Sequence, residues 1–280
     1  MCLVLLGWRV HPEYRLIVAA NRDEFYTRPA EPMRWWPEVP GVLAGRDLGA
    51  RGGIGTWLGL ATAAGRFAGV TNVRNPKGER ADARSRGSLL MDYLRGDQDL
   101  RGPGKYLHDV AAGPDDYNGY HVVASDLATL WWHSNGRPGE PRELAPGFHG
   151  LSNGPSLASA APGPAAELIA PDPIWPKVRD GVDGLRKVVE SEPAAVDRYF
   201  EVLADRTAAP DDQLPDTGIP RDLERAASAR FVSHLAHGTR ASTVLLMRED
   251  GTFEMAERTF GRLGRPKGKV AFSGTVDLPD

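Results

Sequence analysis

The chain has 280 residues, of which 41% are hydrophobic and 25% charged, and its 34 basic and 37 acidic residues give a net charge of −3. This length and apolar fraction predict one domain, residues 1–280, with a buried core. The slight acidic excess argues against a general nucleic-acid binder, and no apolar run approaches the ~18 residues of a membrane span. A single cysteine excludes an internal disulfide and a thiolate metal cluster. We therefore expect a cytoplasmic protein without a targeting segment.

The first elements are two apolar runs, residues 3–10 and 16–20, on either side of the turn His11-Pro12-Glu13-Tyr14. Their pattern predicts an antiparallel hairpin with both strands largely buried. Glycines punctuate residues 45–59, and a further strand is predicted over 67–71.

Helices are predicted mainly in the middle of the chain. Ser85 has the character of an N-cap for a helix over 86–95, with Gly96 after its end. Three more helices are expected over 103–112, 175–190 and 193–205, the last with Pro193 in its first turn.

Hairpins are predicted over 120–124 with 127–132, and over 242–247 with 252–259, followed by an edge strand at 270–272. Residues 155–173 and 207–221 are rich in turn-forming residues, so we expect loops there. Strands lie at both ends without regular strand–helix alternation, which indicates an α+β fold and not a parallel sheet.

Two common kinds of site find no support in the sequence. His234 and His237 could share a helical face, but no third ligand follows at a recognisable interval, so we predict no metal site. There is no Gly-x-Ser-x-Gly motif either, which leaves a serine hydrolase without support.

Cys2, the sole cysteine, is the most informative residue because of its position. A small second residue permits removal of the initiator methionine, after which the thiol and a free α-amine would belong to one residue. The amine titrates near ~7.7–8.0 and could act as base for a thiol whose pKa is near ~8.5. The alternative is that Cys2 is a small apolar residue buried in the first strand.

A polar segment, Asn21-Arg22-Asp23-Glu24, ends the second apolar run. If the first two strands form a hairpin, this segment lies near the start of the chain. Arg22 could then stabilise a thiolate, and Asp23 could orient the terminal amine. The alternative is an exposed turn whose ion pairs contribute little.

With this segment in view, the sequence resembles the NRDE family, also called the transport and Golgi organization protein 2 family. Further blocks that match the family pattern follow in order along nearly the whole chain. They are Arg28-Pro29, Gly45-Arg46-Asp47, Gly55-Thr56-Trp57-Leu58-Gly59, Thr71-Asn72-Val73-Arg74, Ser85-Arg86-Gly87, Tyr117-Asn118-Gly119-Tyr120, Gly150-Leu151-Ser152-Asn153, Trp175-Pro176-Lys177 and Gly238-Thr239-Arg240-Ala241-Ser242-Thr243-Val244.

The family is similar to cysteine-type N-terminal-nucleophile hydrolases, which include penicillin V acylase and bile salt hydrolase. The resemblance implies a four-layer αββα sandwich of two antiparallel sheets. It also implies Cys2 as nucleophile, supported by Arg22 and Asp23, with Asn153 as oxyanion donor and Arg240 as a distal arginine. Four residues from the matching blocks are candidate ligand-binding residues: Asn21, Glu24, Trp57 and Asn72.

One feature of this sequence departs from those acylases. They separate the supporting Arg and Asp by two residues, whereas Arg22 and Asp23 are adjacent and point to opposite faces of a regular strand. Either Asp23 faces the site and Arg22 does not, or the strand bulges there.

Two functions follow. The first is hydrolysis of a non-peptide C–N bond in a small amide, through an acyl-cysteine intermediate and without a cofactor. The second is a non-catalytic carrier of haem or a lipid-like hydrophobic ligand, which the family's associations imply. In the carrier, tryptophans such as Trp131 and Trp132 would line an apolar pocket, and Cys2, His133 or His149 would supply an axial ligand.

Overall fold

The computed structural model describes residues 2–50, 55–75, 78–96, 102–113, 115–163 and 166–278. These residues form two seven-stranded sheets in which every pairing between named strands is antiparallel. The predicted α+β class with two antiparallel sheets is therefore confirmed.

The first sheet has the order β11-β10-β1-β2-β12-β13-β14. Its strands, in chain order, are β1 (Cys2–His11), β2 (Tyr14–Phe25), β10 (Gly147–Leu151), β11 (Ala158–Ala160), β12 (His237–Arg248), β13 (Thr252–Phe260) and β14 (Pro266–Thr275). The N-terminal hairpin thus lies at the centre of the sheet, between strands from the second half of the chain.

The second sheet has the order β3-β4-β5-β6-β7-β8-β9. Its strands are β3 (Ala30–Trp35), β4 (Val42–Asp47), β5 (Leu58–Ala61), β6 (Arg66–Asn72), β7 (Tyr120–Ser125), β8 (Leu130–Ser134) and β9 (Arg142–Glu143). This sheet is a meander, because every strand pairs with its neighbour in sequence.

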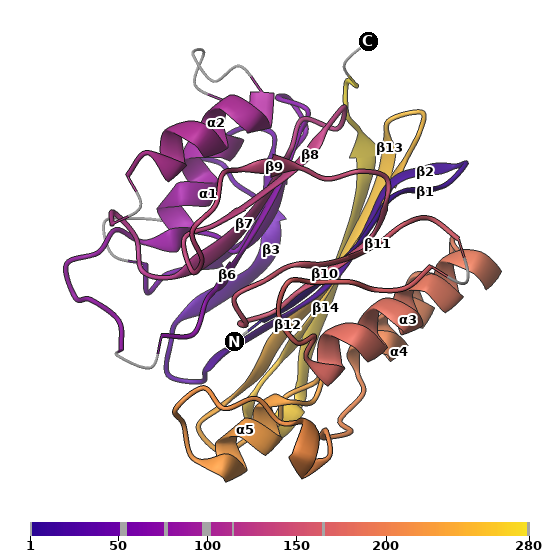
Figure 1. Cartoon of the computed structure of the whole chain (residues 1–280). Helices are drawn as coiled ribbons and strands as arrows, with labels where there is room; N and C mark the ends of the chain where they lie inside the picture. The colour runs from indigo at the N-terminus through magenta and orange to yellow at the C-terminus, as the bar shows by residue number, and fades with distance from the viewer. Residues whose placement is uncertain are drawn as a thin grey trace.

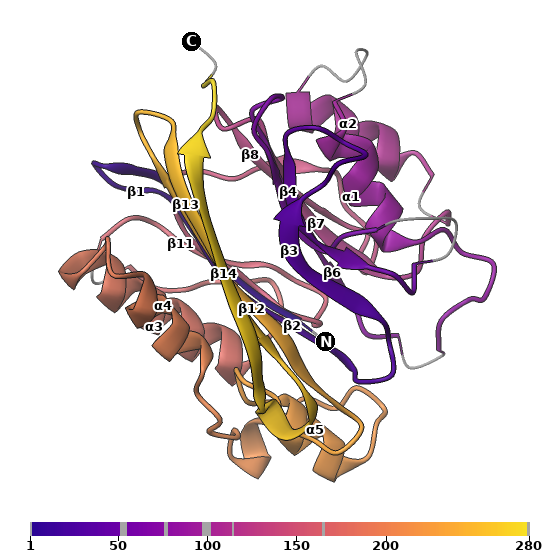
Figure 2. The ribbon, with the colours of Figure 1, turned by 180° about the vertical axis from the view of Figure 1, so that it is seen from behind.

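Helices cover the outer face of each sheet (Figures 1 and 2). Helices α1 (Arg86–Leu94) and α2 (Gly102–Ala111) pack on the second sheet, whereas α3 (Pro176–Ser191) and α4 (Val196–Leu203) pack on the first. The short helix α5 (Arg221–Ala227) follows near one end of the sandwich, and two 3-10 turns span Asp211–Gln213 and Arg262–Gly264. Among the described residues, no helix combines the length and the apolar character needed to cross a membrane.

Alternation along β1 explains why residues 2–6 are all apolar. Val4 and Leu6 pack into the core between the sheets, and Leu3 and Leu5 pack against the helices on the other face. A strand that is covered on both faces gains nothing from polar residues, so the usual alternating pattern is absent. The prediction of a hairpin with two buried strands is confirmed.

Ser85 caps α1 as predicted, since its side chain accepts a hydrogen bond from the amide of Gly87. The prediction for Pro193 is wrong, because α4 begins at Val196 and not around the proline. The carbonyl of Pro193 instead accepts a hydrogen bond from the Tyr199 hydroxyl (2.9 Å), which ties the preceding turn to the helix.

Candidate active site

The candidate site is built around the start of β1. Cys2 lies directly opposite Arg22 in the pairing of β1 with β2, and its side chain is 8% exposed at the edge of the core between the sheets. The expectation that the polar segment 21–24 lies near the start of the chain is therefore confirmed.

Asn153, just after β10, ties three segments together. Its Oδ1 accepts a hydrogen bond from the backbone nitrogen of Cys2 (3.2 Å), and its Nδ2 donates to the backbone oxygen (2.9 Å) and Oδ1 (2.7 Å) of Asn72. The neighbouring Ser152 hydroxyl donates to the carbonyl of Cys2 (2.6 Å). The backbone of Cys2 is thus held from both sides, and the end of β6 is joined to it through Asn72.

Arg22 shares the face of Cys2 that looks toward the second sheet. Its Nη2 lies 3.1 Å from Asp47 Oδ2 on β4 and 3.6 Å from Glu24 Oε2. Arg28 approaches the same Asp47 carboxylate at 2.9 Å. The arginine is 6% exposed, so this ion pair is shielded and links the two sheets beside the thiol.

Asp23 points to the opposite face of β2, the face covered by α3 and α4. Its Oδ1 accepts a hydrogen bond from the Thr239 hydroxyl (2.6 Å) on β12. Burial raises the pKa of this carboxyl above its usual range, while nearby positive charges, including that of Lys177, oppose the shift.

The adjacency of Arg22 and Asp23 is accommodated without a bulge in β2. The pairing with β1 stays in register through Arg22, and the irregularity lies on the partner strand β12, where Arg240 is the extra residue between Thr239 and Ala241. The two side chains therefore lie on different faces of β2.

The Arg240 guanidinium donates to the carbonyls of Phe25 (2.9 Å) and Arg28 (3.0 Å), so it holds the segment after β2. Glu24 accepts a hydrogen bond from the amide of Phe25 (2.8 Å). Glu24 and Arg240 thus lie with Arg28 and Asp47 in a cluster of charged residues around Arg22, beside the Cys2 site.

Asn21 and Trp57 are more deeply buried than residues that contact a ligand need to be. Asn21 is fully buried, donates to the carbonyls of Leu203 (2.9 Å) and Arg230 (2.8 Å), and accepts from the Ser242 hydroxyl (2.6 Å). Trp57 is 8% exposed and packs in the core between the sheets. Ligand binding by these two residues stays a prediction.

Burial raises the pKa of the Cys2 thiol, and the charge of Asp23 adds to the shift while Arg22 opposes it. A thiol in such surroundings is mainly protonated at neutral pH. It needs a base before it can act as a nucleophile.

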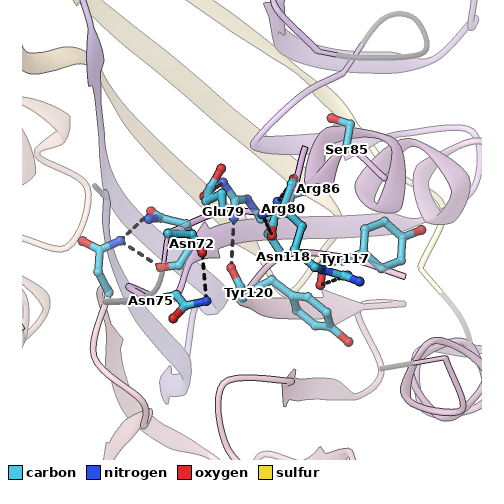
Figure 3. A network of polar contacts seen from close by, with 12 residues as sticks. Asn72, Asn75, Glu79, Arg80, Ser85, Arg86, Tyr117, Asn118 and Tyr120 are labelled. Atoms are coloured by element: carbon cyan, nitrogen blue, oxygen red, sulfur yellow. Dashed lines mark hydrogen bonds and ion pairs between the residues drawn. The ribbon is translucent and has the colours of Figure 1, made fainter. Parts of the chain in front are cut away.

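A network of polar contacts holds the segment that follows Asn72 (Figure 3). The Arg80 amide donates to Asn118 Oδ1 (2.8 Å), Asn118 Nδ2 donates back to the Arg80 carbonyl (3.0 Å), and Arg86 bridges Glu79 (2.7 Å) and the Gly119 carbonyl (3.1 Å). Three separate blocks that suggested the family, at 71–74, 85–87 and 117–120, therefore meet in space.

Three residues near Cys2 were not assigned a role from the sequence: Ser152, Lys177 and Thr239. Each lies in a block that matches the family pattern, which was the available signal. Lys177 lies in the first turn of α3, is 3% exposed and interacts electrostatically with Asp23 and Cys2.

The two histidines considered as haem ligands are engaged in the fold. Both ring nitrogens of His149 have partners, Ser159 Oγ (2.9 Å) and the Ala145 carbonyl (3.0 Å), and burial lowers its pKa to about 4. His133 is 4% exposed, and its Nδ1 lies 2.9 Å from the Tyr120 hydroxyl. These surroundings do not fit an axial ligand, so we derive no step through haem.

Comparison with known proteins gives a consistent result. The family model for Transport and Golgi organisation 2 matches residues 1–262. The chain is 34% identical over 280 residues to the Transport and Golgi organization protein 2 homolog of Bos taurus, which covers 92% of this chain and 93% of the relative. It is 32% identical over 277 residues to the Homo sapiens homolog, with the same coverage, and 25% identical over 274 residues to the Drosophila melanogaster protein.

Proposed function

The chain belongs to the Transport and Golgi organisation 2 family, and within it we propose that this protein is an amidohydrolase whose nucleophile is an N-terminal Cys2, formed by removal of Met1. The observation that carries the proposal is the hydrogen bond from the Cys2 backbone nitrogen to Asn153. The atom that would become the α-amine is thereby held in a buried polar site beside its own thiol.

Because burial raises the pKa of the Cys2 thiol, a base has to take its proton before sulfur can attack. The freed α-amine takes the proton of the thiol as sulfur attacks the carbonyl carbon of the amide. When the tetrahedral intermediate collapses, the C–N bond breaks and the protonated amine gives its proton to the leaving nitrogen. The products of this step are a thioester on Cys2 and a free amine.

Hydrolysis of the thioester uses the same groups. The α-amine takes a proton from water as the water oxygen attacks the thioester carbon. Collapse breaks the C–S bond and returns the proton to sulfur, which releases a carboxylic acid and restores the thiol. Overall, one water molecule cleaves one amide bond.

We assign the oxyanion to the amide pair Asn72 and Asn153. The Nδ2 of Asn153 donates to Asn72, whereas the Nδ2 of Asn72, which is half-buried, makes no hydrogen bond with any described residue. Asn72 thus has donors to offer, and one oxyanion donor is worth ~2.7–4 kcal/mol in characterised enzymes.

The test is turnover of a panel of small amides by the untagged protein. Cys2→Ser should lower turnover by at least about a hundredfold, since a hydroxyl is a weaker nucleophile, and Cys2→Ala should abolish it. Intact mass should show an acyl group on Cys2 during turnover. Unchanged turnover in the Cys2→Ala variant would refute the mechanism.

A carrier of haem or a lipid-like ligand stays the second prediction. The contacts of His133 and His149 do not favour the haem version. A titration of the Cys2→Ala variant with haem that gives a saturable Soret change at micromolar protein would revive that function and weaken the hydrolase proposal.

A further inference from the structure

Lys177 is a buried cation that forms no ion pair in contact with a carboxylate in the described part of the chain, although the charge of Asp23 acts on it. Its side chain is 3% exposed, and its Nζ donates to the neutral carbonyl of Ala227 (3.1 Å). Lys177 forms no salt bridge with any residue in the described ranges. A buried ammonium without a counter-ion in contact costs several kcal/mol, so its retention points to a use beyond packing.

The position of Lys177 in α3 does not explain its charge. The residue stands in the first turn of the helix, where the macrodipole disfavours a cation. Its ammonium lies 5.7 Å from the centroid of the Trp175 ring, and the guanidinium carbon of Arg74 lies 5.8 Å from the same centroid. Two cations therefore gather around one indole.

These residues line a small hollow at the end of the sandwich near α5. The one carboxylate that lines the hollow, Glu224, already accepts hydrogen bonds from other residues of the chain. Glu224 Oε2 accepts from Arg74 (2.8 Å), and its Oε1 accepts from the amide (3.0 Å) and the hydroxyl of Thr217. Glu224 thus balances the charge of Arg74, and Asp23 is the other carboxylate whose charge acts on Lys177.

The hollow adjoins the Cys2 site through a chain of contacts. Trp175 packs on Gly154, where an added Cβ would lie 3.1 Å from the indole. The preceding residue, Asn153, holds Cys2, and its carbonyl accepts from the Arg74 amide (3.0 Å). Lys177 also interacts electrostatically with Cys2, so the hollow and the thiol lie close together.

We propose that the hollow lined by Arg74, Trp175 and Lys177 is a carboxylate-binding subsite, so that the amide hydrolysed at Cys2 carries a carboxylate. This inference rests on the proposed function for the reaction, although the binding itself requires no catalysis. An anion of this kind supplies a counter-ion in direct contact with Lys177, and the indole packs against its apolar part.

The charge of the subsite depends on pH. Burial lowers the pKa of Lys177 to about 8, and the charge of Asp23 opposes this shift while Arg74 adds to it. The other titratable groups that interact with Lys177 are Cys2, Glu224 and His237. Carboxylate binding is thus expected to weaken as pH rises through about 8.

The sole cysteine allows a test that needs no substrate. Iodoacetate and iodoacetamide both react with the thiolate, so the ratio of their rates at Cys2 cancels the ionisation of the thiol and reports on recognition of the carboxylate. We expect this ratio to exceed that of N-acetylcysteinamide in the same buffer by roughly fivefold or more, and to fall with added salt. Intact mass measures both rates.

Matched variants locate the effect. Lys177→Met should lower the ratio to that of the free thiol, and Lys177→Arg should retain most of it. Lys187→Met, which removes an exposed lysine from the same helix, should leave the ratio unchanged.

Each other outcome has a defined meaning. A ratio equal to that of the free thiol, or one that Lys177→Met does not change, overturns the subsite while leaving Cys2 as a reactive nucleophile. If Lys177→Met changes the pH profile of alkylation but not the ratio of rates, the role of Lys177 is its electrostatic interaction with Asp23. That result likewise overturns the subsite. Failure of both reagents to modify Cys2 contradicts the proposed nucleophile, and the subsite with it.

Discussion

Cys2 and Asn153 are 151 positions apart in sequence, yet the backbone nitrogen of the cysteine donates a 3.2 Å hydrogen bond to the side-chain oxygen of the asparagine. The contact exists because β10 pairs with β1 and ends beside its first residue. Asn153 also bonds Asn72 at the end of β6, in the second sheet. One buried amide thus joins the proposed nucleophile to both sheets.

Asn153→Ala should destabilise the fold. The change removes partners from the Cys2 amide and from Asn72, and leaving buried groups unsatisfied costs about 1–3 kcal/mol. Urea unfolding measures the loss. Asn118→Ala, which removes the more exposed pair with Arg80, is the control and should cost less than about 1 kcal/mol. Equal effects would show that the contacts of Asn153 stabilise the fold no more than those of an exposed pair, which would contradict this prediction.

Asn21→Ala should lower stability without altering the reactivity of the thiol. Asn21 links β2 to the carbonyls of Leu203 and Arg230, so its removal leaves buried acceptors unpaired and costs about 2–4 kcal/mol. The alkylation rate of Cys2 under native conditions should stay within about twofold of that of the unmodified protein. A much larger change in that rate would mean that Asn21 belongs to the site.

Stability should depend on pH through Glu257. This buried residue on β13 accepts from the amide of Met33 (2.7 Å), and burial raises its pKa to about 7. The folded state therefore holds the proton more tightly than the unfolded chain. The resulting stabilisation is full below about pH 4.3 and is lost as pH rises through about 7, with a size on the order of 3 kcal/mol.

Glu257→Gln removes this titration. The unfolding free energy of the unmodified protein, measured relative to this variant, should fall between pH 4 and pH 8. Glu254→Gln, which changes an exposed residue of the same strand, should give a difference that is flat with pH. A flat difference for Glu257→Gln as well would contradict the raised pKa.

In a form of the protein that keeps residues ahead of Cys2, the thiol should react slowly with alkylating reagents. Its cysteine nitrogen is an amide and cannot act as a base, and burial raises the thiol pKa. Alkylation by iodoacetamide should therefore be slow at pH 7 and increase steeply above about pH 8.5. The processed form should react faster at pH 7, and equal rates in the two forms would argue against self-activation.

The sequence predicted those elements whose pattern is local. Residues 2–6 of β1 and 16–20 of β2 are continuously apolar because both faces of the hairpin are covered there, and Ser85 marks the start of α1. Strand β3 was not predicted, since it is an exposed edge strand that contains Pro32, and β5 spans just Leu58–Ala61. Helix α5 was also missed, because its seven residues follow a polar loop.

The site was predictable to the extent that pairing follows from the hairpin. The register that sets Cys2 opposite Arg22 follows from two adjacent strands. The bulge at Arg240 and the burial of Lys177 depend on packing between distant segments, β12 with β2 and α3 with β1. Such contacts leave no periodic trace in the sequence.

The most direct test of the central claim is the intact mass of the untagged protein purified from its native host. We expect a mass lower than that of the full sequence by one methionine residue, so that Cys2 carries a free α-amine, and modification by an aldehyde that condenses with an N-terminal cysteine to a thiazolidine. Retention of Met1 would leave the Cys2 nitrogen in an amide bond and would contradict an N-terminal nucleophile.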